Sequence, residues 1–197
     1  MKRPSRPLVL LALLAVSIAG CSSNTQGDSA SPVFLTCQFT LLPAVKNVAD
    51  NSLLQFDTTT LTSKFKSPSA AAGSTTFLDT QVDTYAIVWT RIDGGKTASK
   101  TETFGGNVIV PAGGTSTLTN YPFMSITALQ QPPLSFLWPA NGGIDPEIGK
   151  AEIRQTGTVT WYGHTMSGQP VTSVPAVFDM TFIYSAAAGR VEVKRSR

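Results

Sequence analysis

Alternation of apolar and polar side chains is the feature that most limits what this chain can fold into. Residues 33–42 are the clearest case, with apolar side chains at the odd positions and mainly threonine and glutamine at the even ones. A period of two predicts a β-strand with one buried face. Six further segments are predicted as strands, separated by glycine- and proline-rich turns: 53–66, 82–92, 104–110, 115–121, 151–162 and 176–184.

These segments predict an all-β fold. Helical periodicity is absent after the first twenty residues, and the chain is rich in threonine, which suits a pleated surface. Sheets that each have one apolar face must bury these faces against each other. We therefore expect an antiparallel two-sheet β-sandwich of seven to eight strands. By strand pattern alone it resembles immunoglobulin-like and fibronectin-like domains, although the Cys–Trp–Cys spacing of antibody domains is absent.

The first 21 residues follow a different pattern. A basic stub, residues 1–6, precedes an apolar run, residues 8–18. The run is too short to cross a hydrocarbon core, which needs about 20 helical residues, but it suits a secretory signal. It leads into Ile18-Ala19-Gly20-Cys21. With an aliphatic residue and two small residues before a cysteine, the segment resembles a bacterial lipoprotein signal.

That resemblance implies that residues 1–20 are removed and that Cys21 becomes the acylated first residue, carrying chains such as palmitate. Two or three acyl chains hold a protein on a bilayer far better than one. The implied location is the cell envelope. It would be the outer membrane in a Gram-negative source, because Ser22 and Ser23, and not aspartate, follow the cysteine. The alternatives are an ordinary signal peptide cut near Gly20 and a short membrane anchor.

The remaining chain divides into three predicted parts: a flexible tether at 21–32, the β-sandwich domain at 33–186 and a basic tail at 187–197. Loss of residues 1–20 removes Lys2, Arg3 and Arg6, so 15 basic side chains become 12, which equals the number of acidic ones. Clustered cations, which a nucleic-acid surface needs, remain only in the tail. We therefore expect no nucleic-acid partner.

Side chains that could carry nucleophilic or zinc chemistry are few. The single histidine, His164, is predicted to lie in an exposed turn, and the alternation of the first strand directs Cys37 into the core. With Cys21 acylated, Cys37 has no disulfide partner in the mature chain. One histidine and one thiol cannot supply a zinc site, and no phosphate-binding or nucleophile motif is present. We therefore expect no enzyme, no metal and no cofactor.

A group of oxygen side chains offers an alternative site. Asp145 and Glu147 could act as paired carboxylates, and together with Asn141 and Glu152 they could suit a hard cation such as Ca²⁺. The EF-hand pattern fails, however, because Pro146 stands where that loop requires glycine. A solvated loop is the competing interpretation.

The segment 129–149 is where we expect function. Its prolines and glycines exclude a regular element, and a long stretch without pattern in a compact domain is usually functional or disordered. Four apolar side chains favour order: Leu134, Phe136, Leu137 and Trp138. They either cap one end of the sandwich as part of its core or form a surface that binds a partner.

These patterns predict a lipid-anchored envelope lipoprotein that acts as a non-catalytic binding or structural module. One alternative is an accessory lipoprotein of an envelope or secretion complex. Another is a carbohydrate-active envelope enzyme that uses Asp145 and Glu147. The expected partners are the membrane, through the lipid anchor, and envelope proteins.

Overall fold

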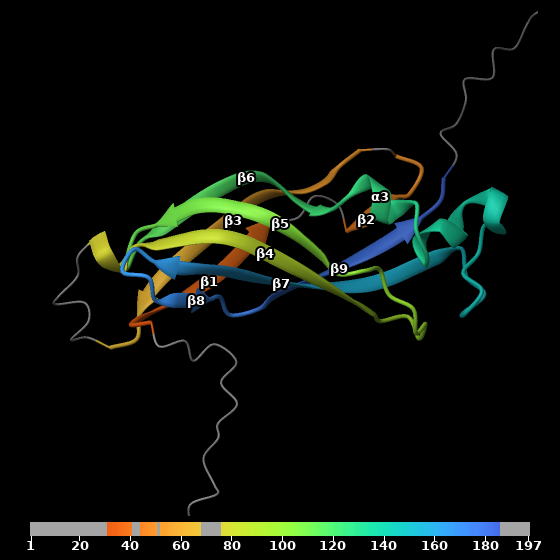
Figure 1. The fold of residues 1–197 in the computed structure, drawn as a ribbon. Helices are drawn as coiled ribbons and strands as arrows, with labels where there is room; N and C mark the ends of the chain where they lie inside the picture. Colours follow the sequence, from red (N-terminus) through yellow and green to blue (C-terminus); the bar gives the residue numbers. More distant parts are fainter. Residues whose placement is uncertain (1–30, 41–43, 51, 68–75, 186–197) are drawn as a thin grey trace, which may run out of the picture.

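The computed structural model describes residues 31–40, 44–50, 52–67 and 76–185, which form mainly β-structure in two packed sheets (Figure 1). The first sheet has the order β1-β3-β6, with β1 at Val33–Thr40, β3 at Leu54–Phe65 and β6 at Thr115–Met124. The second has the order β2-β9-β7-β4-β5, with β2 at Val45–Asn47, β9 at Ala176–Ile183, β7 at Glu152–Thr165, β4 at Thr80–Arg91 and β5 at Glu102–Val110. The short strand β8, Pro170–Thr172, pairs with β7.

The prediction of an all-β fold with two packed sheets is confirmed, and each of the seven predicted strands is present within a few residues of its expected bounds. Two further strands, β2 and β8, bring the number of strands among the described residues to nine. Each has only three residues, which is too short to show alternation. The second sheet is also not purely antiparallel, because β2 runs parallel to β9.

The predicted turn at His164 is wrong. Strand β7 continues to Thr165, and His164 pairs with Gln81 on β4. The strand can continue because Gly163 has no side chain: a Cβ there would lie 2.1 Å from the Gln81 carbonyl oxygen. The imidazole Nδ1 of His164 lies 3.0 Å from Oδ2 of Asp83, at the surface.

The inner faces of both sheets contribute large side chains to one core. Rings from opposite sheets meet across the interior: the centroids of Phe56 and Phe178 lie 5.3 Å apart, and those of Tyr85 and Tyr121 lie 6.0 Å apart. The largest fully buried side chains are Trp161, Tyr85, Phe56, Phe182, Leu35 and Leu61. This interior supplies the apolar burial that stabilises a β-sandwich.

The two long sides of the sandwich differ. On one side β5 and β6 lie against each other, and the Tyr121 hydroxyl donates to the Gly106 carbonyl at 2.7 Å. On the other side β1 meets the chain just before β9, where the Val174 N–H donates to the Leu35 carbonyl at 2.9 Å. Beyond Leu35, no described strand pairs with β1 on this side.

The first strand begins at the end of the sandwich that is opposite the short helices between β6 and β7 (Figure 1). Val33 pairs with Phe65 at one end of β3, whereas Leu54 at the other end pairs with Met124, the last residue of β6. Leu54 and Phe65 are the two ends of the twelve-residue strand β3, which is roughly 40 Å long. Among the residues that the structure describes, no helix is long and apolar enough to span a membrane.

Candidate functional site

Residues 125–150, between β6 and β7, form a cap over one end of the sandwich (Figure 1). They contain α3 (Ile126–Leu129) and the 3₁₀ turns η3 (Leu134–Leu137) and η4 (Pro139–Asn141), while a third such turn, η2 (Thr76–Leu78), lies outside the cap. The Ser125 hydroxyl starts α3 by accepting the N–H of Ala128 at 3.1 Å. Prolines keep each helical piece to about one turn.

The four apolar side chains predicted as a cap or partner surface divide into two pairs. Leu134 and Leu137 are fully buried and join the core cluster. Phe136 and Trp138 are only partly buried, and the Trp138 ring lies 5.6 Å from that of Tyr184, just after β9. Leu134 and Leu137 thus act as core residues of the cap. Partner binding by the other two stays a prediction.

The acidic part of the cap is held by a buried ion cluster. Asp145 has 0% exposure, and its Oδ2 accepts from Nη2 of Arg91, whose side chain is 2% exposed. The same guanidinium donates to both carboxylate oxygens of Asp93, at 2.7 and 2.9 Å. Burial alone would raise the pKa of Asp93, but hydrogen bonds from Arg91 and from two backbone N–H groups lower it below its usual value. The cluster fastens the cap to the end of β4.

Glu147 makes a second connection to the same region. Its carboxylate accepts from the Thr97 hydroxyl and from the backbone N–H groups of Lys96 and Thr97. These hydrogen bonds lower the pKa of Glu147 to about 2, whereas a general acid needs a raised pKa. Among the described residues, no three His, Cys, Asp or Glu side chains gather closely enough to hold a metal ion. Asp145 and Glu147 therefore both make contacts that position the cap.

A hollow of about 290 Å³ lies in the cap beside Trp138, and its other lining residues are Gln130, Ser135 and Asn141. The Asn141 amide donates to the Ser135 carbonyl at 2.8 Å. The indole N–H of Trp138 is buried without a hydrogen-bond partner among the described residues, as are those of Trp89 and Trp161 in the core. Gln130 and Ser135 were not predicted as site residues. They lie in separate turns, and no periodicity in the sequence connects them.

The other predicted site residues lie elsewhere. Cys21 is outside the described residues, as are residues 1–20, most of the tether and the basic tail. Cys37 packs against the core, as the alternation predicts, but it is partly and not fully buried. Burial raises the pKa of its thiol to about 11, and the Trp161 side chain offsets part of that shift. A thiol with a raised pKa is a poor nucleophile at neutral pH.

No family model matches the sequence, and no curated protein matches it. The N-terminal motif, the sandwich and the cap are therefore the features on which a functional proposal can rest.

Proposed function

We propose that this protein is a lipid-anchored lipoprotein of the cell envelope that acts as a non-catalytic binding module. The anchor rests on the N-terminal resemblance, with Cys21 as the acylated residue. The binding role rests on the hollow in the cap, which Trp138 lines together with Ser135 and the side-chain amides of Gln130 and Asn141. These lining residues are uncharged, and their amides can donate and accept hydrogen bonds, so the hollow suits an uncharged, polar partner group.

The finer fold proposal is an immunoglobulin-like or fibronectin-like sandwich. In such domains the second and fifth strands pair in one sheet, and the third, sixth and seventh form the other. The orders β1-β3-β6 and β9-β7-β4-β5 agree with this arrangement if β1 and β2 are two parts of the first strand. A buried tryptophan, Trp89, lies on the strand that corresponds to the third, which also agrees with the antibody pattern.

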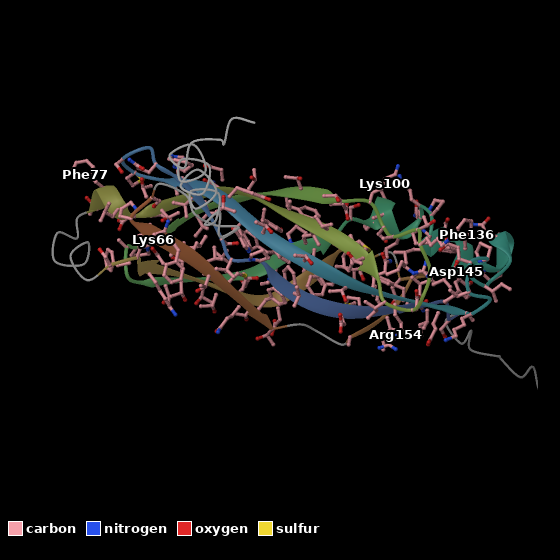
Figure 2. The ribbon with its side chains drawn as sticks, turned by 90° about the horizontal axis from the view of Figure 1, so that it is seen from below. Lys66, Phe77, Lys100, Phe136, Asp145 and Arg154 are labelled. Carbon is pink, nitrogen blue, oxygen red and sulfur yellow. The ribbon has the colours of Figure 1, made fainter. Side chains whose placement is uncertain are left out.

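The end at which the chain enters the first strand favours a role in an envelope complex. Figure 2 shows Lys66 and Phe77 at one end of the molecule and Phe136 and Asp145 at the other. The chain enters the first strand at the Lys66 end, since the Lys66 N–H donates to the Pro32 carbonyl. An anchor at Cys21 would place that end, with the 66% exposed Phe77, near the bilayer. The cap would then face away from the membrane, where it could contact another component of an envelope or secretion complex.

Capture of envelope proteins by the tagged full chain tests the binding role. Trp138→Ala removes the indole, and Asn141→Ala removes one amide from the hollow. The matched control is Ile144→Ala, which changes an exposed cap residue that does not line the hollow. We expect both hollow variants to lose a protein that wild type and the control capture from detergent-solubilised membranes. Equal capture by all four proteins, at matched melting temperatures, would contradict the proposal.

A further inference from the structure

We propose that a groove beside β1 binds an extended, uncharged peptide segment of a partner protein as an added β-strand. The groove has a volume of about 570 Å³, and it is lined by Cys37–Thr40 of β1, Thr58 and Thr60 of β3, and Ala176 and Val177 of β9. It lies on the long side of the sandwich and is separate from the hollow in the cap. The inference goes beyond the proposed function and does not depend on the lipid anchor.

On the β1 side of the groove, some backbone groups have no partner among the described residues. Along an antiparallel strand the N–H and C=O groups of alternate residues point to opposite sides. The Leu35 carbonyl accepts from Val174, away from β3, so the backbone groups of Cys37 and Phe39 point the same way. Among the described residues nothing pairs with them on that side. An extended segment could pair with both residues.

The β9 side of the groove also has backbone groups without a partner among the described residues. The Thr181 N–H donates to the Ala44 carbonyl, and β2 pairs with residues 181–183 only. The backbone groups of Val177 and Asp179 therefore point toward the groove side without a described partner. The bridge between Leu35 and Ser173 is parallel, and the strands before and after Ser173, β8 and β9, are both antiparallel to β7. β1 and β9 therefore run in the same direction. A guest strand that is antiparallel to β1 is then antiparallel to β9 as well.

The chemistry of the groove indicates what kind of segment it takes. None of its lining residues is charged, so an uncharged guest matches it. Exposed edges are commonly protected by charged residues or proline, and Cys37–Thr40 contains neither. Phe39 and Phe178 contact each other at 5.4 Å between ring centroids and close the core behind the groove. Four residues of β1 correspond to about 13 Å of guest strand.

A single strand fits this site better than the edge of a second copy. The groove is bordered by β1 and β3 on one side and by the first residues of β9 on the other, so a guest must lie between β1 and β9. An edge strand of a folded sandwich carries its own sheet behind it, which the opposite wall obstructs. Strand addition gives affinity through main-chain hydrogen bonds and specificity through alternate side chains.

Amide hydrogen exchange of the purified full chain in detergent, followed by NMR, tests the inference. The probe is the peptide acetyl-Thr-Val-Thr-Val-Thr-Val-amide. Its control carries N-methyl groups on alternate residues, which removes the backbone N–H donors along one side of the peptide. Without peptide, Gln38 and Thr40 should exchange slowly because they pair with β3, whereas Cys37 and Phe39 should exchange rapidly. At ten times its Kd, the probe should slow exchange of Cys37 and Phe39 about tenfold. The amide signals of residues 176–179 should shift with it.

A pair of variants at one position completes the test. Val177→Pro removes an N–H of the β9 wall, and this side chain is 65% exposed, so an edge proline is tolerated there. We expect it to weaken probe binding about fivefold, whereas Val177→Thr, which keeps the N–H, should bind as wild type does. Equal effects of the probe and the N-methylated control would overturn the inference.

Two results without peptide would also overturn it. Slow exchange of Cys37 and Phe39 at every protein concentration would show that another part of this chain covers the edge. Slow exchange that appears only at high protein concentration would show that a second copy covers it. Failure of the anchor or of the cap hollow changes none of these readouts, so the proposals are tested separately.

Discussion

Cys37 reports the register of the first strand through its accessibility. Its side chain points inward with Leu35, and burial raises its pKa from 9 to about 11. Since the thiolate is the reactive species, we expect iodoacetamide at pH 8 to label the native protein about 100-fold more slowly than the denatured protein. The Cys21→Ser variant leaves Cys37 as the only thiol. Rapid labelling of the native variant would show that the register is shifted by one residue.

The same raised pKa predicts a loss of stability at high pH. Below about pH 9 the thiol is protonated in both the folded and the unfolded chain. Between about pH 9 and 11 the unfolded chain loses this proton while the folded chain keeps it, so the free energy of unfolding falls. Urea titrations at pH 8 and 10.5 should show a larger loss for wild type than for Cys37→Ala. Equal losses would contradict the burial of the thiol.

Gly157 on β7 is required by packing. A Cβ at this position would lie 2.6 Å from the Phe178 ring and 3.1 Å from that of Trp89. Gly157→Ala should therefore lower the free energy of unfolding by about 1–3 kcal/mol, the usual effect of overpacking. Gly105→Ala is the matched control, because nothing lies within 4 Å of its Cβ. Denaturant melts that give the two variants the same stability would show that these rings move aside.

At the scale of the elements, alternation was sufficient to predict the long strands, since each buries one face. It could not predict β2 and β8, which have three residues each. It also placed the end of β7 too early. Gly163, before His164, is typical of a turn in the sequence. In the fold it instead allows β4 and β7 to approach each other closely.

The candidate site was predicted only in part for a related reason. Apolar content alone predicted that the cap is ordered, and Leu134 and Leu137 are buried there. The roles of Asp145 and Glu147 depend on Arg91 and Thr97, which lie about fifty residues earlier in the chain. No local pattern in the sequence encodes such a pairing. The groove beside β1 is likewise formed by strands that are far apart in the sequence.

The buried ion cluster makes the cap depend on one carboxylate. Asp145→Asn keeps the shape of the side chain but removes the charge that faces Arg91, which then has Asp93 as its one ionic partner among the described residues. Removing one partner of a buried pair is costly, so we expect a loss of about 3 kcal/mol in the free energy of unfolding. Asp57→Asn, at an exposed position on β3, serves as control. Equal urea midpoints for the two variants would contradict this role.

At the scale of the whole molecule, three separate regions are arranged along the two packed sheets. The chain enters β1 at one end, the cap closes the other, and the groove lies on the long side between them. A lipid at the entry end would leave both the cap and the groove clear of the bilayer. A protein anchored in this way could contact one partner through its cap and a second through its side.

The two cysteines give a matched test of the anchor. If Cys21 is acylated, Cys21→Ser should move the protein from the detergent phase to the aqueous phase in a phase-partition experiment, because the acyl chains supply the affinity for the micelle. Cys37→Ser changes the same residue type within the folded domain and should leave partitioning unchanged. A Cys21→Ser protein that partitions with detergent at the mature size would show that the anchor lies elsewhere in the chain.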